Sequence, residues 1–228
     1  MKKNLSKLKL LFLFAILSCG LPADNSLDQI VDLYGGKFHL ENGVKVSTAE
    51  GKENFIKVVS ENNKLVADGW LLPEAMSNNC AVLFTSLNPK NVKENDFLEV
   101  EISNGEPSSF KYKKHDLDEL GKEYRSVEKI LFTLINDLKT NEINKVKGMI
   151  EKTPSLSEKD LTSFLYAFKS TIPSNYKETK LIGYRKENAP EQLFIVDGVL
   201  IAQDETQKMV NATLVSIGND LKFREINF

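Results

Sequence analysis

Residues 192–226 read QLFIVDGVLIAQDETQKMVNATLVSIGNDLKFREI, a succession of β-prone segments separated by turn-forming residues. Asp197-Gly198 and Gly218-Asn219-Asp220 are typical of tight turns, because these residue types adopt the backbone angles that such turns require. We predict strands at 192–196, 199–203, 208–217 and 221–226, with a further strand at 178–186 before them. The spacing predicts an antiparallel meander.

Three helical segments precede these strands. Apolar residues recur along them at helical spacing, as Val127, Ile130, Leu131, Leu134 and Leu138, then Ile143, Val146 and Ile150, and finally Leu161, Phe164, Leu165 and Phe168. Ser157 and Asp160 resemble a capping box at the start of the third segment, and Pro173 ends it. Helices followed by consecutive strands indicate an α+β domain in which helices pack on one face of an antiparallel sheet.

This order of elements resembles the cystatin-like and NTF2-like group of small domains, over residues 122–228. The resemblance implies helices cradled by a strongly curved sheet. In that group the space between helix and sheet is a ligand pocket or active site in some members and solid core in others, so the fold alone does not give the function. Tyr184, Gln203 and Asn211 are polar residues in otherwise apolar strands, and each either lines such a pocket or faces water.

The sequence of the first half of the chain predicts a second α+β domain with an antiparallel sheet, at residues 34–115. A short helix comes before it and ends at Gly35-Gly36. Apolar residues alternate on both sides of Asn42-Gly43, which predicts a hairpin with a two-residue turn at that point. Further strands are expected at 53–60, near 65–67, and at 98–102 and 110–112. A helix is predicted from Pro73 to Leu87, and the join between the domains is placed at 113–122.

The N-terminus has the order of a secretory signal peptide. Basic residues come first, then an apolar run at 10–17, and then Ser18-Cys19-Gly20. The apolar run is far shorter than the roughly 20 residues of a membrane-spanning helix, so we predict that residues 1–18 are removed. Residues 19–33 then form a tether and the short helix.

Ile16-Leu17-Ser18-Cys19 resembles the lipobox of bacterial lipoproteins. The resemblance implies diacylglycerol on the Cys19 thiol, cleavage before Cys19 and acylation of the new amino group. Several acyl chains hold a soluble domain at a membrane, since each buried methylene contributes about 0.8 kcal/mol. Gly20 stands where aspartate would retain such a protein in the inner membrane, which favours the outer membrane. An ordinary signal peptide with an incidental cysteine is the alternative.

The combination of a β-rich first half with this second half is similar to uncharacterised lipoproteins of Bacteroidota, for which no activity is implied. The charge supports neither nucleic-acid binding nor membrane binding through the protein surface. The chain has 30 Lys and Arg against 32 Asp and Glu, and the four lysines of residues 1–18 leave with the signal peptide. A nucleic-acid backbone or an anionic lipid headgroup attracts a basic protein surface, and this chain has no excess of basic residues.

Isolated residues that could serve catalysis or metal binding each have a structural explanation. Cys80 lies among apolar helix positions, so we expect packing rather than nucleophilic chemistry. His39 points away from its apolar neighbours and is expected at the surface. His115 precedes Asp116, Asp118 and Glu119 in a charged stretch that we interpret as a solvated linker, because the spacing fails the pattern of a calcium-binding loop.

Two further features receive structural interpretations. Glu99 and Glu101 are expected on one strand face, opposite Lys111 and Lys113 of the next strand, where cross-strand charge pairs fix the register. Trp70, the only tryptophan, is expected to anchor the core, with a sugar-stacking platform as the alternative. No dinucleotide-binding, P-loop, nucleophile-elbow or zinc-protease motif occurs.

The sequence therefore predicts a lipid-anchored protein of the bacterial envelope that acts as a non-catalytic binding or scaffolding module. Its membrane partner is reached through the lipid on Cys19, and another envelope protein is the expected binding partner. The alternative is a small-ligand-binding or catalytic pocket in the C-terminal domain. No cofactor, metal or nucleic acid is implied.

Overall fold

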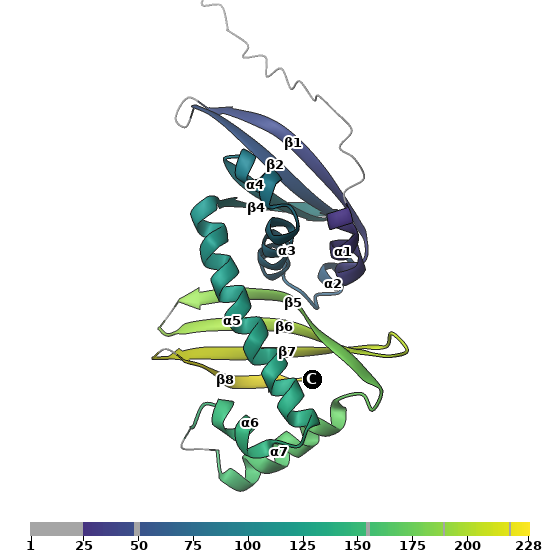
Figure 1. Ribbon diagram of the computed structural model, residues 1–228, viewed down its shortest axis with the longest axis vertical. Helices are drawn as coiled ribbons and strands as arrows, with labels where there is room; N and C mark the ends of the chain where they lie inside the picture. Colours follow the sequence, from purple (N-terminus) through teal and green to yellow (C-terminus); the bar gives the residue numbers. More distant parts are fainter. Residues whose placement is uncertain (1–24, 48–50, 154–155, 189, 219) are drawn as a thin grey trace, which may run out of the picture.

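The computed structural model describes residues 25–47, 51–153, 156–188, 190–218 and 220–228. The protein is an α+β structure with two four-stranded sheets, one in each half of the chain (Figure 1). Helices lie between the sheets and against the second sheet, so that the molecule is elongated. The predicted signal peptide and Cys19 fall outside the described residues.

The first sheet contains β1 (Lys37–Ser47), β2 (Gly51–Glu61), β3 (Phe97–Asn104) and β4 (Glu106–Lys113), in the order β1-β2-β3-β4. The outer pairs are antiparallel, but β2 and β3 are parallel. The prediction of an antiparallel sheet is wrong for this central pair. Between β2 and β3 the chain crosses through α2 (Lys64–Ala67), α3 (Pro73–Leu87) and α4 (Pro89–Glu94), and such a crossover returns the second strand parallel to the first.

The second sheet is the predicted antiparallel meander of β5 (Tyr176–Asn188), β6 (Gln192–Ala202), β7 (Gln207–Ile217) and β8 (Asp220–Asn227). It follows α5 (Lys114–Lys139), α6 (Ile143–Met149) and α7 (Glu158–Thr171). The Ser157 hydroxyl accepts a hydrogen bond from the backbone N–H of Asp160 at 3.1 Å, which confirms the predicted cap of α7. Helices-then-strands is therefore the observed order in this half.

Two Asx-Gly pairs that predicted turns lie instead inside long strands. Asn42-Gly43 is in the middle of β1, and Asp197-Gly198 is in the middle of β6. A Cβ atom at Gly43 would lie 2.6 Å from the ring of Phe55, and one at Gly198 would lie 2.8 Å from Leu131 of α5. Both glycines thus lie where a side chain of another element approaches the strand closely, and not in a turn.

Local boundaries also differ from the prediction. Residues 64–67 form α2 and not a strand, because Asn63 caps them by accepting a hydrogen bond from the Val66 N–H at 3.3 Å. The predicted linker at 113–122 is largely the first part of α5, which begins at Lys114. The carboxylate of Asp116 accepts from the backbone N–H of Lys113 at 2.8 Å and so caps this early start.

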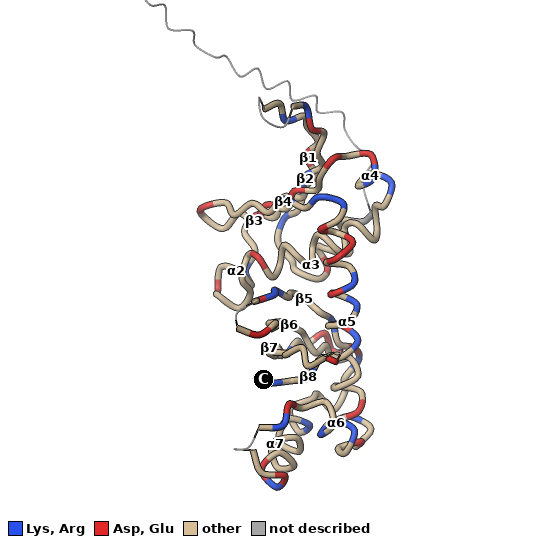
Figure 2. Tube along the Cα trace, turned by 90° about the vertical axis from the view of Figure 1, so that its left-hand side faces the viewer, with Lys and Arg blue, Asp and Glu red and all other residues tan. Residues whose placement is uncertain are grey.

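Helix α5 starts beside the first sheet and then runs across one face of the second (Figure 1). α2 lies on the opposite face of the second sheet from α5 (Figure 2). Accordingly, Leu181 and Val196 pack with α5, whereas Ile182, Val199 and Ile201 pack with the first half of the chain. Apolar side chains on both faces of β5 and β6 are therefore packed, and the two faces belong to different apolar clusters. The division into two domains stays a prediction.

Candidate functional site

Buried side chains of the first half bond to the edge strand of the second sheet. β5 is an outer strand, so its carbonyl oxygens on that edge need donors from outside the sheet. The side chain of Asn78 donates to the carbonyl of Tyr184 at 3.0 Å, and that of Asn79 donates to the carbonyl of Leu181 at 3.1 Å. The amides of α3 thus replace a neighbouring strand.

Two tyrosines extend these contacts into relays. Asn79 also donates to the hydroxyl of Tyr34 at 2.5 Å, and this hydroxyl donates to the carbonyl of Ile182 at 2.7 Å. In parallel, the hydroxyl of Tyr112 donates to Asn78 at 2.9 Å. Burial raises the pKa of Tyr34 well above its ordinary value, so its hydroxyl keeps the proton that it donates. These relays hold the two sheets in a fixed relation.

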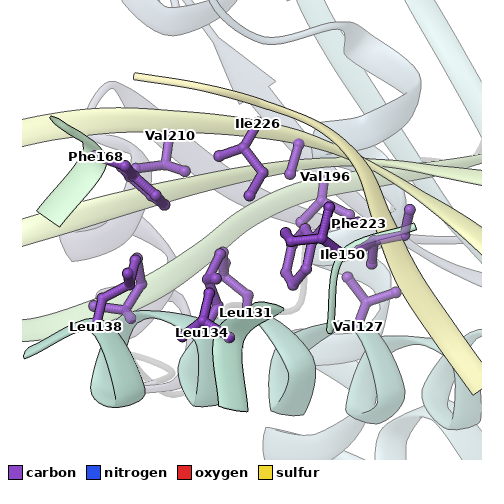
Figure 3. Packing of buried hydrophobic residues seen from close by; sticks show 14 of the residues in the cluster. Val127, Leu131, Leu134, Leu138, Ile150, Phe168, Val196, Val210, Phe223 and Ile226 are labelled. Carbon is purple, nitrogen blue, oxygen red and sulfur yellow. The ribbon is translucent and has the colours of Figure 1, made fainter. Parts of the chain in front are cut away.

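The interior that would form a pocket in the second half is filled. Figure 3 shows Leu131, Leu134 and Leu138 of α5 directed at residues of the sheet and at Phe168 of α7. The Phe168 ring also stacks on that of Phe228 with centroids 4.7 Å apart. Tyr184, one of the predicted pocket residues, is buried, and its hydroxyl donates to the carbonyl of Leu120 at 2.8 Å.

Trp70 is exposed, so the prediction that it anchors the core is wrong. Its side chain is 61% exposed and that of Leu72 is 51% exposed, while Leu71 between them is buried. The backbone N–H groups of Trp70 and Leu71 both donate to the carbonyl of Leu65, at 2.8 and 3.0 Å. We call residues 68–72 the Trp70 turn. It fixes an exposed indole on a rigid base.

A polar row lies beside this turn on the second sheet. Gly183 of β5, Asp197 of β6 and Asn211 of β7 are direct cross-strand neighbours, and we call these three residues the polar row. Leu71 covers Gly183 so closely that a Cβ atom there would lie 2.5 Å from it. Directly opposed residues share one face of a sheet, so Asp197 and the Trp70 turn lie on the same side.

The negative charge of Asp197, the one ionisable residue of the polar row, is partly compensated. Burial raises the pKa of Asp197, while the hydrogen bond that Asn211 donates at 2.7 Å and the nearby positive charge of Arg185 act in the opposite direction. Arg185 also pairs with Glu187, and its Nε is buried with no hydrogen-bond partner among the described residues. This cluster was missed because Asp197 was interpreted as a turn residue. An alternating pattern continued through 193–201 would have placed it on this face.

A surface groove of about 330 Å³ lies in the second half, between α5, α6 and the start of β8. It contains three lysines from three elements, Lys129 of α5, Lys145 of α6 and Lys222 of β8. Asp137 and Asp220 line it as well. The groove can therefore hold a small anion, with acidic groups nearby to limit its net attraction.

The remaining candidate residues are structural or solvated. Cys80 is buried, and burial raises the pKa of its thiol to about 12, so it packs as predicted and holds no thiolate near neutral pH. His39 and His115 are exposed, each beside a carboxylate, at 3.4 Å from Glu41 and 2.9 Å from Asp116 respectively. Gln203 is exposed and faces water.

Of the charge pairs predicted between the last two strands of the first sheet, the structure has one in the expected register. Lys111 lies opposite Glu99, but its ammonium contacts Glu53 at 2.8 Å and the Phe97 ring at 3.9 Å. The expectation that Lys113 faces Glu101 is wrong, because Lys113 lies opposite Phe97 and Glu101 opposite Ser109. Glu101 pairs instead with Lys57 at 2.6 Å. The parallel neighbour β2 supplies that lysine, and a parallel β2–β3 pair was not foreseen.

Within the described ranges, no three His, Cys, Asp or Glu side chains gather closely enough to hold a metal ion. Of the helices in those ranges, none combines the length and hydropathy that a membrane span needs.

Comparison with known proteins gives no family. No family model matches the chain, and no curated protein matches it. Among solved structures, the chain is similar to an NTF2-like protein from Campylobacter jejuni, with 9% sequence identity and a TM-score of 0.34. The similarity covers 42% of this chain and 95% of that chain. Nothing about function follows from a likeness of this degree.

Proposed function

We propose that this chain is a lipid-anchored protein of the bacterial envelope and that its body is a non-catalytic module that binds another envelope protein. The lipobox-like Ile16-Leu17-Ser18-Cys19 supports the anchor, and Gly20 supports the outer membrane as its destination. The wider relation to lipoproteins of Bacteroidota stays a prediction. The exposed Trp70 on its rigid turn is the observation that supports binding.

The Trp70 turn has the properties of a recognition site. Tryptophan is enriched among the residues that dominate protein–protein binding energy, because it buries a large area with few rotatable bonds. Trp70 and Leu72 are both exposed, and Leu71 holds the turn against β5 before any partner binds. A fixed turn loses little conformational entropy on binding. Beside the turn, the polar row contains the Asp197 carboxylate, which is buried and already bonded to Asn211.

The binding role can be tested by capture from envelope extract with the full chain. We expect the wild-type protein to recover a specific partner and the Trp70→Ala/Leu72→Ala variant to lose it. Tyr166→Ala is the matched control, because Tyr166 on α7 is another exposed aromatic residue, at 52% against 61% for Trp70. Retention of the same partner by the double variant, or repeated recovery of no partner, would contradict the proposal.

The anchor can be tested separately at the two cysteines. We expect native Cys19 to carry added lipid mass, and Cys19→Ser to move the protein from the membrane fraction to the soluble fraction. Cys80→Ala is the control, because this buried thiol is not available for modification. An unmodified Cys19 in the intact mass, or unchanged partitioning of Cys19→Ser, would refute the lipid anchor.

A second candidate function is the binding of a small anion in the lysine-lined groove. Its volume of about 330 Å³ and the three lysines among its lining residues favour this candidate over a site in the filled interior. Calorimetric titration with inorganic phosphate and with citrate should then show binding that Lys129→Gln weakens. Lys159→Gln is the control, since Lys159 is exposed on α7. No heat of binding with either anion would remove this candidate.

A further inference from the structure

The outer edge of β1 is an open strand edge of the described structure. β1 is the first strand of its sheet, and no described strand pairs with its other side. In the second sheet, the edge of β5 is bonded by side chains of α3, and β8 is bridged at one point, where Glu151 N–H donates to the Phe223 carbonyl at 2.8 Å. The remaining edge strand, β4, contains Pro107, which lacks an N–H group.

Apolar side chains are exposed along the same strand. Val44 is 50% exposed and Val46 is 69% exposed, and they share a strand face with Leu40. Nearer the start of β1, this face packs against helices, because Leu40 contacts the apolar cluster that includes residues of α1 and α3. β1 thus combines an edge on which no described strand pairs with exposed apolar side chains, which is the combination that favours pairing with another strand.

We propose that β1 pairs antiparallel with β1 of a second copy of this chain, with Gly43 of each copy on the two-fold axis. In this register Glu41 lies opposite Lys45 of the other copy, and by symmetry the same pair forms twice. Leu40 lies opposite Val46, also twice, on the other face of the strand. The two first sheets then form one continuous sheet of eight strands.

The charges of β1 select this register. Centring the pair on Glu41 would place two glutamates opposite each other and Lys37 opposite Lys45, which is repulsive. Centring it on Asn42 would place His39 opposite Lys45, with no acidic partner. Only the register centred on Gly43 gives Lys45 the Glu41 carboxylate and also covers Val46 with Leu40.

The Glu41–Lys45 pair cannot form within one chain. Four residues of a strand span about 13 Å, so the two charges on one β1 lie too far apart to contact each other. Within the chain, the Glu41 carboxylate lies 3.6 Å from Lys57 and 3.4 Å from His39, and it remains half exposed. It can therefore accept a further cation from outside. The proposed pairing does not depend on the lipid anchor or on the Trp70 turn.

Cysteine cross-linking of the full chain tests the register. We expect Glu41→Cys/Lys45→Cys to give a disulfide-linked dimer under mild oxidation, because the two positions face each other across the axis. Glu41→Cys and Lys45→Cys alone place like cysteines about 13 Å apart and should give no more dimer than wild type. Wild type corrects for any linkage through the native cysteines. A double variant that cross-links no better than the single variants would overturn the proposal.

Charge exchange tests the energetic basis in the same full chain, by sedimentation at several concentrations. Lys45→Glu should weaken dimerisation by about tenfold, because two attractive pairs become repulsive. Adding Glu41→Lys should restore much of the loss. Lys37→Glu is the control, since residue 37 lies outside the paired segment 39–47. A monomeric wild-type protein at all concentrations, or no rescue by the second exchange, would refute the pairing.

Discussion

The side-chain amide of Asn79 donates to the carbonyl oxygen of Leu181 at 3.1 Å, across 102 residues of sequence. This bond and the parallel one from Asn78 to Tyr184 satisfy carbonyl groups on a sheet edge that would otherwise be buried without donors. The same contacts bring α3 against β5 and place the Trp70 turn beside the polar row. The position of the candidate binding site therefore depends on two adjacent asparagines.

Replacement of Asn79 should destabilise the whole chain. Asn79→Ala leaves the carbonyl of Leu181 without its side-chain donor, so we expect a loss of about 2 kcal/mol in the free energy of unfolding. Urea denaturation gives this value, and hydrogen exchange should show faster opening in both sheets. Asn136→Ala on the exposed face of α5 is the control and should change stability by less than about 0.5 kcal/mol. Faster exchange confined to one sheet would argue against a fixed relation between the sheets.

Gly183 should tolerate no side chain. In Gly183→Ala, the new Cβ atom would lie 2.5 Å from Leu71 Cδ1 and 3.3 Å from the backbone carbon of Ala75. The contacting atom of Ala75 belongs to the backbone of α3 and cannot rotate away. We therefore expect the free energy of unfolding, measured by heat or urea, to fall by about 2 kcal/mol. Gly148→Ala is the matched control, since nothing lies within 4 Å of that position in α6. It should gain up to about 1 kcal/mol through helix propensity. Equal stabilities of the two variants would contradict the close approach.

Asp197 should make stability depend on pH. Burial raises its folded-state pKa above the unfolded value, so protonation favours the folded state. The stabilisation is fully present below the unfolded pKa and is lost as pH rises through the folded pKa. Asp197→Asn removes this titration and retains an acceptor for Asn211. Its urea midpoint relative to wild type should therefore rise as the pH increases above the ordinary aspartate pKa of about 3.9. A difference that stays constant over this range would show that Asp197 does not titrate as argued.

The exposure of Trp70 should be visible in fluorescence without any label. Because Trp70 is the only tryptophan, its emission reports on the Trp70 turn alone. We expect ready quenching by acrylamide in the folded protein, and protection from quenching when a captured partner is bound. Trp70→Ala should change the free energy of unfolding by less than about 0.5 kcal/mol. Poor quenching in the folded state, or a loss of several kcal/mol, would mean that the indole is packed.

The elements with strong periodicity could be predicted from the sequence. Met76, Cys80 and Phe84 repeat at helical spacing, and α3 has the predicted bounds Pro73–Leu87. The strands around Leu98, Val100 and Ile102 and the meander after Pro173 also follow local alternation. These features depend on contacts that each segment makes with one face of its surroundings, and periodicity reports such a face directly.

The errors share a cause in long-range packing. Gly43 and Gly198 follow Asn42 and Asp197, which is the local signature of a turn, but each glycine accommodates a side chain from another element. The partner, Phe55 in one case and Leu131 in the other, cannot be identified from the local sequence. A turn and a close approach both favour glycine, so local sequence did not separate them.

The candidate site could be predicted less well for the same reason. Trp70 follows Asp68-Gly69 and precedes two leucines, a pattern that is compatible with burial or exposure. Its exposure is set by Leu71, which occupies the space over Gly183 more than 100 residues later. Asn78 and Asn79 likewise carried no visible signal, because their acceptors lie on β5.

The relay through Tyr34 has a mechanical consequence. Tyr34 belongs to α1 (Asn25–Tyr34), the first described element of the chain, yet its hydroxyl donates to Ile182 of the second sheet. Tension applied at the amino end is thus shared from the outset by both sheets. The force would be carried by hydrogen bonds and helix packing that connect the two sheets. We therefore expect both sheets to unfold in one event under tension, and not one after the other.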